Sequence, residues 1–169
     1  MNDASYSSIR LARWDEIPDF GLYLDQVLTF VRSNLPDPDG QGEKLFTSAM
    51  VNNYVKMGAI EAPVKKKYSR KQLAVLIVIG LLKSVIPISD IRDYISSEIT
   101  DESSALSYNN FCDMYETANA RAFRESEEKI ISGESSLNHA LIRAAVLSCA
   151  QRSVAGSLLG RLEDGKKNK

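Results

Sequence analysis

The sequence is poor in the residues that carry acid–base and metal chemistry. It contains one histidine, His139, and two cysteines, Cys112 and Cys149. No histidine, cysteine or carboxylate cluster has the spacing of metal ligands, and no serine lies in a nucleophile-elbow pattern. The glycines form no phosphate-binding loop, because Gly40 and Gly42 follow no predicted strand. We therefore expect no enzymatic activity, cofactor or metal, and we interpret His139 as a partly exposed surface residue at the start of a helix.

The sequence also lacks a long apolar run and a secretory leader. Its longest apolar stretch, Leu73 to Leu82, is far shorter than the roughly 20 residues that span a bilayer. The N-terminus has no basic segment followed by an apolar one. We therefore expect a cytoplasmic protein with no membrane partner. In that compartment the two cysteines are expected to be buried free thiols, and a disulfide between them is the alternative.

Charge is distributed unevenly along the chain, although the net charge is only −1. Between Lys44 and Lys83 there are eight basic residues and one acidic residue, Glu61, whereas the segments on both sides are acidic. A basic middle is typical of a local anion-binding surface. It is also consistent with charge pairing between segments of the same chain, and the sequence leaves both interpretations open.

Hydrophobic periodicity predicts a mostly α fold, because no segment alternates like a strand for more than a few residues. Thr47 is the expected N-cap of a helix that Gly58 ends, Ser69 and Gln72 form a capping box, and Ser89-Asp90 is expected to cap a short helix. Residues 59–67 are expected to form a tight hairpin or an extended loop. The predicted helices cover residues 22–35, 48–57, 70–85, about 89–96, 104–131 and 137–162.

These helices divide into two predicted lobes. The first covers residues 11–99, and the second is a helical hairpin over residues 100–162. Residues 1–10 and 163–169 are expected to be flexible ends.

Polar and basic side chains gather in the basic middle. Asparagine can pair with an adenine edge in the major groove, lysine can reach guanine, and lysines in a turn can hold phosphates. The alternative is that the lysines form a solvated turn and the asparagines bond to the preceding loop. The candidate DNA-binding residues are Ser48, Asn52, Asn53, Lys56, Lys65, Lys66, Lys67, Tyr68, Arg70 and Lys71.

The segment from about Lys44 to Ile95 resembles the DNA-binding head of the MerR regulators. The resemblance rests on Tyr54, Gly58, Ile60, Pro63, Tyr68, Ser89 and Ile91. It implies a winged helix-turn-helix lobe with a short wing, followed by a long two-helix C-terminal lobe that is the candidate for a homodimer interface by analogy. The alternative is that this C-terminal hairpin packs within the same chain against the central helix Leu73 to Leu82. The chain departs from the MerR pattern in four ways. The loop before Thr47 is longer, the wing is shorter, and Asn52 stands where an arginine is usual. No cysteine or ligand-binding domain of the metal- or drug-sensing type is expected after the helix-turn-helix.

A longer part of the chain resembles an uncharacterised bacterial family, domain of unknown function 1836. The residues that carry this resemblance are Trp14 to Pro18, Leu22 to Val27, Met50 to Lys56 and Lys65 to Ser69. The family implies a MerR-like helix-turn-helix and no assigned activity.

The sequence therefore predicts a DNA-binding transcriptional regulator that contacts double-stranded DNA through a helix-turn-helix and a basic wing. The alternative is a protein–protein interaction module that keeps the helix-turn-helix core as a scaffold. A third interpretation has the C-terminal helices enclosing an apolar effector.

Overall fold

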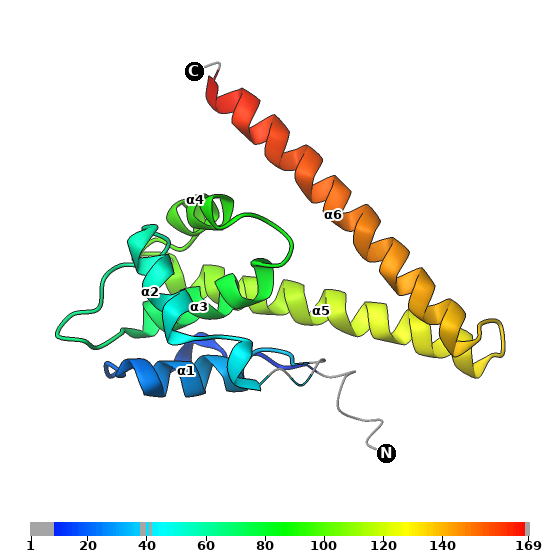
Figure 1. Ribbon diagram of the computed structural model, residues 1–169, viewed down its shortest axis with the longest axis horizontal. Helices are drawn as coiled ribbons and strands as arrows, with labels where there is room; N and C mark the ends of the chain where they lie inside the picture. Colours follow the sequence, from blue (N-terminus) through cyan, green and yellow to red (C-terminus); the bar gives the residue numbers. More distant parts are fainter. Residues whose placement is uncertain (1–8, 38–39, 41, 168–169) are drawn as a thin grey trace. The chain divides into compact units, whose positions relative to one another are not determined.

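The computed structural model describes residues 9–37, 40 and 42–167, and the described chain is mostly helical without an extended strand. This confirms the predicted mostly α fold. The elements, drawn in Figure 1, are the short 3-10 helices η1 (Trp14–Glu16) and η2 (Gly42–Lys44) and the helices α1 (Leu24–Ser33), α2 (Ser48–Lys56), α3 (Arg70–Leu82), α4 (Ile88–Glu98), α5 (Ser104–Ile131) and α6 (Leu137–Lys167). No described helix is long and apolar enough to cross a membrane.

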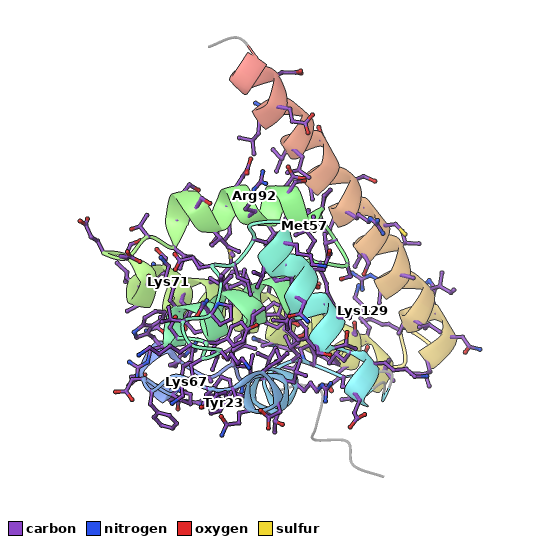
Figure 2. All side chains as sticks on the ribbon, turned by 60° about the vertical axis from the view of Figure 1, so that its left-hand side comes forward. Tyr23, Met57, Lys67, Lys71, Arg92 and Lys129 are labelled. Carbon is purple, nitrogen blue, oxygen red and sulfur yellow. The ribbon has the colours of Figure 1, made fainter. Side chains whose placement is uncertain are left out.

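The chain divides into two compact units, the first ending at Thr117 and the second beginning at Ala118. In the first unit, α3 is the central helix, and every residue from Gln72 to Ile79 is buried. Helices α1, α2, α4 and the first half of α5 each place apolar side chains in the same core. Side chains of this unit gather densely around α3 (Figure 2). The uninterrupted apolar sequence of α3 is explained by this position, because neighbours cover it on all sides.

Local capping sets the helix ends that the sequence predicted. The Thr47 hydroxyl accepts a hydrogen bond from the Met50 N–H at 3.3 Å, and Gly58 adopts the left-handed conformation with φ 66°. Ser69 and Gln72 form the reciprocal capping box at the start of α3. These contacts satisfy backbone groups that a helix end leaves without partners.

The cap of α4 was predicted wrongly. The helix begins at Ile88, and Pro87 is its N-cap residue, so Ser89 and Asp90 lie inside the first turn. Proline suits this position because its fixed φ fits the helix entrance and no N–H is required there. Helix α3 also ends earlier than predicted, at Leu82. Near that end Gly80 approaches the Leu35 side chain so closely that an added Cβ would lie 2.6 Å from its Cδ1.

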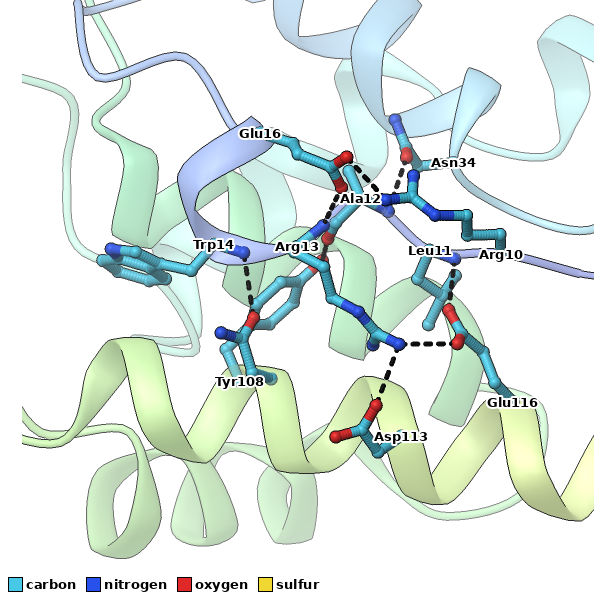
Figure 3. A network of polar contacts seen from close by, with 11 residues as sticks. Arg10, Leu11, Ala12, Arg13, Trp14, Glu16, Asn34, Tyr108, Asp113 and Glu116 are labelled. Carbon is cyan, nitrogen blue, oxygen red and sulfur yellow. Dashed lines mark hydrogen bonds and ion pairs between the residues drawn. The ribbon is translucent and has the colours of Figure 1, made fainter.

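The segment before α1 is bound to α5 by a polar network (Figure 3). The Glu116 carboxylate accepts from the Leu11 N–H and from the Arg13 guanidinium, both at 2.7 Å. The buried Tyr108 hydroxyl donates to the Ala12 carbonyl at 2.8 Å. The first unit therefore includes the first half of α5, which lies beyond residue 99. Further contacts to the segment come from Asn34, Asn109 and Asp113.

The second unit contains the end of α5 and the whole of α6. Gly133 adopts φ 75° in the connection, and the Ser136 hydroxyl accepts from the His139 N–H at 3.2 Å. His139 is exposed at the helix start, as predicted. Both cysteines are free, but only Cys112 is buried; Cys149 lies exposed on α6, so the expectation of two buried thiols was wrong. Of the predicted flexible ends, residues 1–8 and 168–169 lie outside the described part, and residues 163–167 belong to α6.

Candidate nucleic-acid interface

Helix α2 presents a polar face opposite its apolar one. Val51 and Tyr54 are buried in the first unit, and the Tyr54 ring lies 6.0 Å from the ring of Phe46. Because residues three and four apart share a face, this packing turns the opposite side of the helix to solvent. The predicted contact residues Ser48, Asn52, Asn53 and Lys56 are all exposed there.

Lys83, which the site prediction did not include, binds the loop that leads into α2. Its Nζ donates to the Leu45 carbonyl at 2.6 Å and lies 5.3 Å from the centre of the Phe46 ring. Burial lowers the pKa of this amine. One of the eight cations in the basic middle is therefore used to hold the loop that leads into α2. The sequence signal was its position at the end of an otherwise apolar helix, where a lone lysine is placed next to the core.

The lysine run forms a two-residue turn. Val64 and Lys67 are paired as an isolated antiparallel bridge, with N–H to carbonyl distances of 3.1 and 2.9 Å in the two directions. The central residues, Lys65 and Lys66, have φ values of 50° and 64°. Left-handed conformations at both central positions define a type I′ turn, which matches the twist of a hairpin. Within the range 59–67, for which the sequence left a tight hairpin or an extended loop open, the structure has a tight turn at residues 64–67 and no regular structure at residues 61–63.

This turn is conformationally costly for lysine. Residues with a Cβ avoid the left-handed region, and type I′ turns strongly favour Asn-Gly. Both lysines adopt that conformation on an exposed tip and make no ion pair within the described chain. Lysine at these two positions therefore does not serve the stability of the turn.

The base of the turn is packed onto the segment before α1. Lys67 lies against Gly21, where an added Cβ would be 2.8 Å from the lysine Cβ, and its Nζ lies 5.2 Å from the centre of the Tyr23 ring. Tyr68 and Leu22 exchange backbone hydrogen bonds at 2.9 and 3.0 Å. The Tyr68 side chain is only 3 % exposed, and burial raises the pKa of its phenol. This geometry supports a packing role for Tyr68 beneath the turn instead of the DNA contact that the sequence analysis proposed for it.

The next two cations of the candidate set are engaged within the chain. The Arg70 guanidinium donates to the Ile17 carbonyl at 2.8 Å and lies 3.9 Å from the Asp19 carboxylate. Lys71 forms an ion pair with Asp101, which lowers the pKa of that carboxylate. Both side chains are less available to an external anion than the sequence suggested.

The exposed candidates lie in two elements of the first unit. One is the polar face of α2, and the other is the lysine turn, by which we mean residues 64–67. Lys67 and Tyr23 lie together in Figure 2, and Met57, which follows α2, lies apart from them. The geometry offers a helix face with amide and amine groups and a separate cationic tip, and it lacks a cluster of three or more metal-ligating side chains among the described residues.

Comparison with known proteins identifies one family. The domain of unknown function DUF1836 matches residues 12–117, a range that ends with the first unit and includes both α2 and the lysine turn. No curated protein and no solved structure matches the chain. Since the match covers more than half of the sequence, the chain belongs to the DUF1836 family.

Proposed function

We propose that this protein is a DNA-binding transcriptional regulator whose first unit contacts a duplex through α2 and the lysine turn, as a MerR-like winged helix-turn-helix with a minimal wing. The observation that carries the proposal is the lysine turn. Two residues that are unfavourable for its backbone present free ammonium groups at its tip. Strained positions of this kind are retained where function requires the side chain.

Each element has a distinct task in this proposal. Lys65 and Lys66 hold backbone phosphates, which contributes affinity without sequence information. Asn52 and Lys56 on α2 approach base edges, where asparagine pairs with adenine and lysine with guanine. Lys67 contributes mainly by anchoring the turn to Tyr23, and Arg70 and Lys71 support the fold around it.

The test is a fluorescence-anisotropy titration of a random-sequence duplex at several salt concentrations. We expect the wild-type chain to bind at low salt. Lys65→Gln/Lys66→Gln should weaken binding to every sequence and reduce the slope of log K against log salt by about 2, since each lost phosphate contact removes about 0.9. The matched control is Arg124→Gln/Lys129→Gln, which removes the same charge from the second half of α5 and should leave the slope unchanged. An unaltered slope in the lysine-turn variant contradicts the assignment.

Recognition of the DNA sequence by α2 is tested separately. After selection of a preferred duplex from a random pool, Asn52→Ala should reduce the preference for that duplex over others while changing binding to random DNA little. If Asn52→Ala weakens all sequences equally, α2 does not read bases.

The alternative is a protein-interaction module that keeps the helix-turn-helix core as a scaffold. The contacts of Arg70 and Lys71 favour this alternative, because both cations interact with groups of the same chain and are less available to DNA. The same titration separates the two functions. Absence of duplex binding at low salt contradicts DNA binding and favours the scaffold.

A further inference from the structure

The second unit has no core of its own. Among residues 118–165 none is buried, and α6 exposes large apolar side chains along its whole length. Leu137, Leu141, Leu158 and Leu162 are between 51 % and 73 % exposed. A helix gains most of its stability from packing of an apolar face, so a helix of this length without a single buried side chain among its described residues requires a partner.

The exposed leucines belong to a regular seam. Starting at Leu137, the residues on one side of α6 recur at alternating steps of four and three, an average spacing of 3.5 that keeps a stripe facing one neighbouring helix. The repeat continues for about four heptads, or about 38 Å of helix at 1.5 Å per residue. The seam consists of Leu137, Leu141, Ala144, Ser148, Gln151, Ala155, Leu158 and Leu162.

The seam reads almost the same in both directions: two leucines, an alanine, two polar residues, an alanine and two leucines. A two-fold axis requires a surface that is complementary to itself. We propose that α6 pairs with α6 of a second copy of this chain as an antiparallel coiled coil, with the two-fold axis between Cys149 and Ala150. Leucine then meets leucine at both ends, alanine meets alanine, and Ser148 lies opposite Gln151 of the partner.

The small and polar centre determines the register. The alanines let the two helices approach closely, and the Ser148–Gln151 pairs form hydrogen bonds in an otherwise apolar seam. A polar residue in such a seam selects one register at a cost in stability. A slip by one heptad would place leucines against serine or alanine and leave others in water.

Two further observations favour the antiparallel direction over the parallel one. Leu147 and Val154, which flank the seam and are 48 % and 53 % exposed, face each other across the antiparallel pair. In a parallel pair Leu147 would face Arg152. Glu163 and Asp164 of one copy also lie near the partner's helix N-terminus, where negative charge is favourable, instead of beside each other.

The molar mass in solution tests whether the partner of α6 is a second copy of the chain. By sedimentation equilibrium over a wide concentration range, the full chain should reach twice its 18.7 kDa mass. Leu141→Lys/Leu158→Lys should shift it to monomer. Ile142→Lys/Val146→Lys, which replaces equally exposed apolar residues off the seam, should remain dimeric. A monomeric wild type, or equal dissociation of both variants, overturns the proposal.

Cross-linking tests the direction and does not depend on how the lysine variants fold. In a Cys149→Ser background, where the remaining Cys112 is buried, Ala144→Cys and Ala155→Cys chains are coexpressed and oxidised. The antiparallel pair places these two positions opposite each other, so the mixture should form a disulfide-linked dimer and neither chain should do so alone. Cross-linking of a single chain, or none in the mixture, contradicts the antiparallel seam. Both tests are independent of DNA binding.

Discussion

We predict that the two central lysines of the lysine turn, Lys65 and Lys66, favour DNA binding and reduce the stability of the fold. Replacing Lys65 by Asn and Lys66 by Gly supplies the pair that a type I′ turn favours and removes both ammonium groups. The variant should therefore fold more stably than the wild type and bind duplex DNA more weakly. A second variant, Lys65→Val/Lys66→Val, removes the same charge and places β-branched residues where the backbone is left-handed. It should bind equally weakly and fold less stably.

The magnitudes follow from the two φ values. A left-handed backbone costs a residue with a Cβ roughly 1–2 kcal/mol, and Asn tolerates it better than Lys. Glycine removes the cost but returns about 0.5–1 kcal/mol through the greater freedom of the unfolded chain. Lys65→Asn/Lys66→Gly should thus raise the free energy of unfolding by about 1 kcal/mol, or Tm by about 4 °C for a unit of this size. The valine pair should lower the free energy of unfolding by about 1–2 kcal/mol.

Urea unfolding followed by circular dichroism measures the stability of each variant, and the anisotropy titration measures its affinity. If Asn-Gly fails to stabilise the protein relative to Val-Val, the two lysines are not held in the left-handed conformation. If the two variants differ in duplex affinity after folding is verified, the loss is caused by unfolding of the turn instead of by loss of charge.

Three further predictions concern single residues. Gly80→Ala should lower the free energy of unfolding by about 1–3 kcal/mol, because the new Cβ would lie 2.6 Å from a leucine methyl group. The same change at Gly156, which faces open space in α6, should raise the helix content. Urea unfolding measures the first effect and circular dichroism the second, and equal effects of both changes would refute the packing argument. Tyr108→Phe should cost about 1–2 kcal/mol because a carbonyl in the polar network loses its donor, as urea unfolding would show; no loss would mean that water replaces the hydroxyl. Asp101→Asn should strengthen duplex binding and steepen its salt slope by about 1, because Lys71 becomes free for one more phosphate; unchanged binding would place Lys71 outside the contact surface.

Helix positions were predictable from the sequence because they depend on neighbours in the chain. Thr47, the Ser69–Gln72 pair and Gly58 each act within four residues, so the pattern of side chains is sufficient to identify a helix end. The same locality explains the correct prediction that one face of α2 is exposed. Its apolar stripe at Val51 and Tyr54 indicates which side is buried.

Whether a cation of the candidate site is free to contact an external anion was not predictable in this way. Arg70 is engaged by the carbonyl of Ile17 and Lys71 by Asp101, which is thirty residues further along the chain. Such pairs form only when the fold brings distant segments together. The turn type was also hidden, because Lys-Lys has no preference for left-handed φ and resembles any solvated lysine run.

The contacts of the segment before α1 also determine when this protein can finish folding during synthesis. Leu11 and Arg13 find their partner in Glu116, a sequence separation of 105 residues for the Leu11 contact. At about 5–20 residues per second, a ribosome needs roughly 5–20 s to extend the chain from one partner to the other. The apolar residues of α3 leave the ribosome before the part of α5 that completes their core, by the time needed to add the 37 residues from Ile79 to Glu116, which is roughly 2–7 s at the same rate. We therefore expect Leu73 to Ile79 to be exposed for that time during synthesis.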